Sequence, residues 1–239
     1  MHEARAEPLL LGGLAIDVVA VPGRKSVRVT VERDATITAA VPPGTDHKAL
    51  ETLLRSRLTW LYAKVGDRRA DAAERPTRRF IDGEGFYYLG RSYRLKTVRE
   101  APRPFALVEG RMRLRQDRRP TAAEDLIAWY AERGRQWLPA RVAPWAERMK
   151  APMTELTVRT LGYRWGSCSH AGAINVHWAA MQLPSSLIDY VLVHELAHLH
   201  QANHSPEFWQ VVSRVLPNFE SRRQKLDEWG AGIWLPDSP

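Results

Sequence analysis

The longest hydrophobic run in the chain predicts a buried helix in its last third. Between residues 187 and 199 apolar side chains occur on every side of a helix rather than along one stripe, which is typical of a helix inside a core. Ser186 and Asp189 have the spacing of a capping box, so we expect the helix to begin there. Two histidines and one glutamate interrupt the run, and such groups need partners when they are buried.

The first part of the chain has the alternation of apolar and polar residues that is typical of β-strands. Residues 14–41 contain three alternating or β-branched stretches, which end at the Pro-Pro-Gly of residues 42–44. Asp46 then predicts the cap of a helix that runs to about residue 65. Residues 80–115 return to short strands separated by glycines. This pattern predicts a β-rich section with one helix.

The second half opens with a helix that the sequence predicts to be interrupted. Thr121 and Glu124 have capping-box spacing, and an amphipathic segment follows them. Pro139 and Pro144 have no N–H to donate, and their rings clash with the preceding turn. We therefore expect the helix to break near residue 138.

The remaining segments predict a small sheet, a polar helix and a free end. Residues 155–159 and 173–178 have strand composition, and residues 218–229 form a polar helical segment. The tail from residue 230 is expected to be loosely held.

The organisation that follows is α+β in two parts. A basic and proline-containing stretch at residues 118–120 predicts a boundary between a β-rich basic section, 1–118, and a second domain, 119–239. The sequence contains no long internal repeat.

The strongest chemical signal lies in the buried helix. His194 and His198 are four residues apart, so both imidazoles face one side of the helix, with Glu195 directed toward the same place. His204 reaches this side only if the chain turns back, and Asn203 is a residue that tolerates the left-handed conformation of such a turn. Three histidines suit Zn²⁺ and leave a fourth position for water, which is typical of a catalytic site. We expect one zinc per chain.

Several side chains are candidates for the chemistry around that metal. Glu195 is expected to act as the general base that takes a proton from the metal-bound water. Arg164, His177 and Tyr190 are candidates for stabilising the developing oxyanion, although packing or surface contacts explain each of them as well. Glu207 has two interpretations, an acceptor for a ligand imidazole N–H or an acid in the first turn of a helix.

Two nearby side chains have simpler explanations. His200 lies two residues after His198, so it points away from the metal face. Cys168 could ligate a metal or sense redox state, but a lone cysteine beside small residues is more typical of a small buried side chain. Because it is the only cysteine in the chain, it also favours a reducing, cytoplasmic compartment. No run of 18 uncharged apolar residues predicts a membrane span.

The positive charge is unevenly distributed. Residues 1–118 contain 23 Lys and Arg against 15 Asp and Glu, whereas residues 119–239 contain 12 of each. This asymmetry favours an anionic partner for the first half, either a nucleic acid or a nucleotide. The alternative is a solvated surface with an arginine bias, because arginine outnumbers lysine 29 to 6.

Two segments carry a resemblance to a known family. The first is the Arg-Trp-Gly-Ser-Cys-Ser of residues 164–169, and the second runs from Asp189 through the histidine motif to Phe208-Trp209. Together they resemble the YgjP-like metal-dependent hydrolases, also called the YgjP-like metallopeptidase domain. The resemblance implies a zincin-type core, in which a small sheet lies over the HExxH helix and its edge strand borders the substrate cleft. The chain departs from the expected pattern at His177, where an arginine-bearing strand is expected.

The sequence therefore predicts a zinc-dependent metallohydrolase, most simply a metallopeptidase acting on a peptide or protein. Two alternatives stay open. One is a nucleotide or phosphoanhydride hydrolase of pyrophosphatase type that uses the same metal site. The other is a DNA-associated protease similar to the SprT-like and WLM families.

Overall fold

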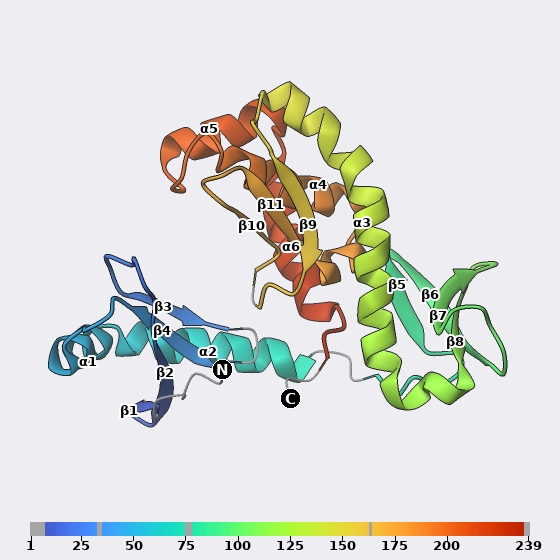
Figure 1. Cartoon of the computed structure of the whole chain (residues 1–239), viewed down its shortest axis with the longest axis horizontal. Coiled ribbons are helices and arrows are strands. Elements are labelled where there is room, and N and C mark those ends of the chain that lie inside the picture. Colours follow the sequence, from blue (N-terminus) through green and yellow to red (C-terminus); the bar gives the residue numbers. More distant parts are fainter. Residues whose placement is uncertain (1–7, 33–34, 75–77, 163, 237–239) are drawn as a thin grey trace. The chain divides into compact units, whose positions relative to one another are not determined.

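The computed structural model describes residues 8–32, 35–74, 78–162 and 164–236, and the chain divides into two compact units between Glu74 and Arg75. Within the described residues there are three small sheets and six α-helices, so the α+β class is confirmed (Figure 1). No helix in these ranges has the length and apolar character needed to cross a bilayer.

The first unit is a four-stranded sheet with two helices. Its strands are β1 (Leu9–Leu11), β2 (Leu14–Ala20), β3 (Arg28–Val31) and β4 (Ile37–Val41), in the order β1-β2-β4-β3. The Asp46 carboxylate accepts a hydrogen bond from the Ala49 N–H and caps α1 (His47–Ser56). A second helix, α2 (Leu58–Glu74), follows after Arg57, so two helices replace the single helix expected here.

The second unit begins with a sheet of the same topology. Its strands are β5 (Gly85–Tyr88), β6 (Arg91–Val98), β7 (Phe105–Val108) and β8 (Arg111–Arg115), in the order β5-β6-β8-β7. In both sheets the two central strands are parallel and each outer strand is antiparallel to its neighbour. The chain therefore repeats one topology, although its sequence shows no repeat.

This second sheet explains why the units divide earlier than the expected boundary at residue 118. Its apolar face, with Phe86, Leu95 and Met112, belongs to the same buried core as Trp129 and Tyr130 of the following helix. Residues 78–118 are thus held by the second unit. A short 3₁₀ turn (Gln116–Thr121) connects this sheet to the helix.

The following helix, α3 (Ala122–Met149), runs through the position of the expected break near residue 138. Leu138, directly before Pro139, and Val142, between the two prolines, are buried in the core, and this packing outweighs the hydrogen bonds lost at the prolines. Figure 1 shows that α3 bends in its C-terminal part instead of ending, as proline predicts for a continuous helix.

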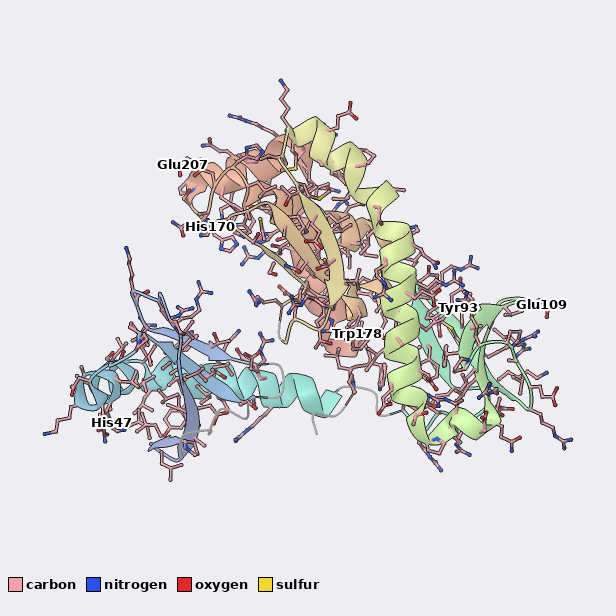
Figure 2. The ribbon with its side chains drawn as sticks, viewed as in Figure 1. His47, Tyr93, Glu109, His170, Trp178 and Glu207 are labelled. Atoms are coloured by element: carbon pink, nitrogen blue, oxygen red, sulfur yellow. The ribbon has the colours of Figure 1, made fainter. Side chains whose placement is uncertain are left out.

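The rest of the unit is a three-stranded sheet with three helices. The strands β9 (Glu155–Arg159), β10 (Gly166–Cys168) and β11 (Ala173–His177) are arranged in the order β10-β11-β9. A 3₁₀ turn (Trp178–Gln182) leads to α4 (Ser185–Ala197), α5 (Pro206–Val215) and α6 (Phe219–Gly232). Trp178, labelled in Figure 2, is fully buried in this core.

Residues 231–236 are held more firmly than we expected. Ile233 and Trp234 are buried, and the Trp234 backbone exchanges two hydrogen bonds with the Gln182 side chain. These two residues therefore belong to the core rather than to a loose tail.

The turn between β5 and β6 contacts the entrance to α4. The Leu89 N–H donates to the Met181 carbonyl at 2.8 Å, and the Gly90 N–H donates to the Gln182 carbonyl at 3.3 Å. Gly90 has a φ of +80°, and a Cβ atom placed on it would lie 2.9 Å from the Pro184 Cα. This position therefore requires glycine for both its backbone conformation and the close approach.

Replacing Gly90 with Ala should destabilise the protein by about 2–4 kcal/mol, because left-handed strain and overpacking both act there. The matched control is Gly110→Ala at the turn between β7 and β8, where φ is +72° and a Cβ would meet nothing within 4 Å. The control should lose only about 1–2 kcal/mol of strain. Equal losses of unfolding free energy in urea would show that the contact with Pro184 does not matter.

Candidate metal centre

The three histidines of the motif come together at the end of α4. His194 lies in the last turn of this helix, His198 is its C-terminal cap, and His204 follows in the next turn of chain. The Nε2 atoms of His194 and His204 are 2.9 Å apart, and one nitrogen from each of the three rings lies within 4.8 Å of the others. This spacing fits three ligands of one ion.

The chain returns to this point without the left-handed residue that we expected at Asn203. The described non-glycine residues with positive φ do not include Asn203, and the turn is closed by the Ser205 N–H donating to the Asn203 carbonyl at 2.8 Å. The next helix, α5, begins at Pro206 as the sequence predicts.

Two aromatic residues at the start of α5 support the imidazole rings. Phe208 is fully buried, and its ring centroid lies 4.7–5.0 Å from those of all three histidines. Trp209 stacks on His204, with centroids 5.7 Å apart. These contacts restrict the rotamers of the rings, so the nitrogen atoms are positioned before any ion binds.

The electrostatics of the rings suit metal ligation. Burial and the neighbouring His198 and His204 lower the pKa of His194 to about 3, and burial lowers that of His204 as well. Both rings are therefore neutral at pH 7, which is the form that binds metals. The His198 Nδ1 faces the Gln201 carbonyl at 3.2 Å, which leaves Nε2 free for an ion. The donor set thus fits a divalent metal such as zinc.

Glu195 lies beside this cluster inside the core. Its side chain is 7% exposed, and burial raises its pKa to about 8 against the opposing charge of Arg164. A Cβ atom on Gly166 of β10 would lie 2.7 Å from both Cγ and Oε1 of Glu195. The absence of a side chain at residue 166 therefore makes room for the carboxylate.

An ion pair with a buried carboxylate holds α4 in place. Asp189 accepts two hydrogen bonds of 2.6 Å from the Arg141 guanidinium of α3 and one of 3.2 Å from the Trp145 indole. Arg222 of α6 lies 3.9 Å from the same carboxylate and donates to the Ser186 carbonyl. Asp189 is thus a bridge between helices, not the capping-box partner of Ser186 that we expected, and the helix cap is Pro184 without a side-chain hydrogen bond.

Comparisons with known proteins give a family match and a structural neighbour. The model of the YgjP-like metallopeptidase domain matches residues 25–229, which is most of the chain. The chain belongs to the YgjP-like metallopeptidase family. No curated protein matches it. Among solved structures, the metallopeptidase zymogen abylysin of Pyrococcus abyssi is 22% identical, with a TM-score of 0.35 over 39% of this chain and 95% of that chain.

In this YgjP-like domain two of the other candidate residues, His177 and Glu207, have structural roles. The buried His177 Nδ1 accepts the Ala179 N–H at 3.0 Å and caps the 3₁₀ turn, so this ring has a structural role. Glu207 accepts a hydrogen bond from the Ser205 hydroxyl in the first turn of α5, in agreement with the interpretation as a helix N-terminal acid (Figure 2).

Tyr190 and Arg164 remain beside the centre. The ring of Tyr190 is 6.0 Å from that of His194, and burial raises the pKa of its hydroxyl to about 12, so it stays a hydrogen-bond donor. Arg164 is exposed, and its charge acts on Glu195. The Cys168 thiol is half-buried, and burial followed by the charge of Glu195 raises its pKa to about 11, so it is protonated at pH 7.

The structure adds one candidate functional residue that no sequence motif of this YgjP-like domain indicated. Arg223 of α6 lies over the Trp209 ring, 5.5 Å from its centroid, and its charge lowers the pKa values of His194 and His204 and opposes the rise at Tyr190. Arg223 belongs to a polar helix that carries no motif, and only the packing of α6 on α4 brings it to the site.

Replacing His204 with Ala should abolish stoichiometric binding of a divalent metal, because two imidazoles hold an ion far more weakly than three. The matched control is His200→Ala, which removes an exposed histidine four residues away. The control should retain one metal per chain by elemental analysis. Loss of metal in both variants would contradict the assignment of His204 as a specific ligand.

Replacing Gly166 with Ala should lower activity more than tenfold while metal content stays the same, because the added methyl group displaces the Glu195 carboxylate but no ligand. The matched control is Ser167→Ala on the next residue of β10. If Gly166→Ala were as active as wild type, the close packing against Glu195 would have no part in catalysis.

Proposed function

We propose that this chain is a zinc-dependent metallopeptidase with one zinc held by His194, His198 and His204. The observation that supports it most directly is Glu195, a carboxyl group that is buried beside three convergent imidazoles. An acid in this position is costly to the fold unless it has a function or a partner.

The residues of the chain divide the chemistry in a simple way. When bound, zinc supplies a Lewis acid that activates water and polarises the scissile carbonyl. Glu195, whose ionised form would be favoured by the positive charge of a bound metal, then accepts the proton of the attacking water and returns it to the leaving amine. The Tyr190 hydroxyl, kept protonated by burial, is our candidate donor to the developing oxyanion.

The small sheet supports a peptide as the substrate. β10 is an edge strand, paired on one side with β11, and its Gly166 lies against Glu195. An extended peptide that adds to such an edge would pass directly beside the metal centre. In this proposal α4 and the β9–β11 sheet form a zincin-type core.

A second candidate is favoured by the cations around the centre. Arg164, just before β10, acts on Glu195, and Arg223 of α6 acts on His194 and His204, so positive charge lies near the histidines from two segments of the chain. Such charges suit an anionic substrate, and hydrolysis of a nucleoside triphosphate by the same machinery is therefore the alternative.

Replacing Glu195 with Gln should lower turnover by about 10²–10⁴-fold with zinc content unchanged, because the amide fills the same space but cannot accept the proton. The panel is casein, a protein crosslinked to DNA, and nucleoside triphosphates, and the substrate lost in the variant identifies the class. Glu207→Gln, an exposed acid on the next helix, is the control and should remain active. Full activity of Glu195→Gln would refute the mechanism.

A further inference from the structure

One face of the β5–β8 sheet carries a concentrated positive charge. The apolar residues of β6 and β8 point to the core, and the alternate positions point outward, where they form what we call the basic face: Arg94, Lys96, Arg111, Arg113 and Arg115. The parallel register sets Arg94 beside Arg111 and Lys96 beside Arg113. Like charges side by side in a sheet are destabilising, so this arrangement has a cost that needs a reason.

The charge is local to this part of the chain. Residues 78–118 contain 11 Lys and Arg against 5 Asp and Glu, a net of +6, out of +8 for the whole protein. The excess that the sequence assigns to the first half therefore belongs mostly to the unit that also holds the histidine cluster.

Two ordinary explanations do not account for the basic face. Lysines and arginines often protect sheet edges from pairing, but β6 and β8 are the two central strands. An exposed face needs polarity but not one sign of charge.

The first sheet provides an internal control, because it has the same topology. Its central strands β2 and β4 present Ala15, Asp17, Val19, Thr38 and Ala40 at the outward positions. This topology therefore does not require cations on that face.

Part of the charge is uncompensated. Arg113 pairs with Glu109 at 2.5 Å and Arg115 with Asp117 at 2.6 Å, whereas Arg94 donates only to the Gly83 carbonyl. Lys96 and Arg111 are exposed, and in the described part of the chain neither has an acid within salt-bridge distance. Three cations are thus available for an external anion.

We propose that the basic face binds the phosphodiester backbone of a nucleic-acid duplex without regard to sequence. Guanidinium groups bind phosphate oxygens through two parallel hydrogen bonds, and four of the five cations are arginines. Proteins that hold single strands add aromatic platforms for the bases. On the basic face the nearby ring is Tyr87 of β5, and it packs against Trp229, so it is not a free platform.

This surface is separate from the metal centre. In Figure 1 the β5–β8 sheet lies on one side of α3, and the β9–β11 sheet with α4 and α5 lies on the other. Figure 2 labels Glu109 at the outer end of the β5–β8 sheet, far from Glu207 on α5. The binding proposal goes beyond the proposed peptidase and does not depend on it, since it requires no metal and no turnover.

The test measures binding of the full chain to a labelled 20-base-pair duplex by fluorescence anisotropy at several salt concentrations. The variant Arg94→Gln/Lys96→Gln/Arg111→Gln should bind at least tenfold more weakly, and the slope of log affinity against log salt should fall by about 2.7. The control Arg135→Gln/Arg214→Gln/Lys225→Gln removes three exposed cations from the same unit and should stay within about twofold of wild type. The double variant Lys96→Gln/Arg111→Gln should show about two thirds of the slope change of the triple variant.

Competing ligands decide the chemical class of the partner. Single-stranded DNA of equal length, polyglutamate and vesicles containing anionic lipid are tested on wild type at the same salt concentration. Weaker binding to all three than to the duplex supports the proposal. Equal losses in the two triple variants, a wild-type salt slope near zero, or binding to any competitor as tight as to the duplex would overturn it.

Discussion

Burial of α4 is the constraint on which the rest of this unit depends. The helix carries two imidazoles and a carboxylate into a core where unpaired polar groups are costly. Three neighbouring residues offset this cost. Phe208 supports the rings, Gly166 leaves space for the acid, and Arg141 neutralises Asp189 at the other end of the helix. A divalent ion would complete the compensation by uniting the three imidazoles.

The two sheets share one topology but have different structural roles in their units. In the second unit the β5–β6 turn rests on Pro184 and the sheet packs on α3, so this sheet is part of the scaffold that positions α4. In the first unit the sheet packs on its own helices, with Leu50, Leu54 and Leu61. The difference in their outward residues shows that the topology leaves those positions free for other uses.

Much of the site could be predicted because its information is local. The i, i+4 histidine spacing, the apolar run around it and the Ser-Pro start of α5 are each contained in a few residues, and the structure has α4 and α5 where they indicate. The histidine that closes the cluster, His204, needed only the assumption of a turn.

The features that could not be predicted depend on distant packing. α3 continues through Pro139 because Leu138 and Val142 are buried by other segments. The boundary lies at residue 74 because the β5–β8 sheet packs on a helix that follows it in sequence. Arg223 had no local signal, and the importance of Gly166 becomes clear only when the Glu195 side chain is placed against it.

The contact between Gly166 and Glu195 also restricts which substitutions these two positions can accept during evolution. Each residue sets the space open to the other: while residue 195 keeps a glutamate, residue 166 has no room for even a methyl group, 2.7 Å from two of its side-chain atoms. The two positions are 29 residues apart in the chain, and we expect substitutions at one to depend on the residue at the other. If a smaller residue replaced Glu195 in a related protein, residue 166 could become larger. A larger side chain at position 166 in a relative would therefore indicate that the catalytic acid at position 195 has been lost.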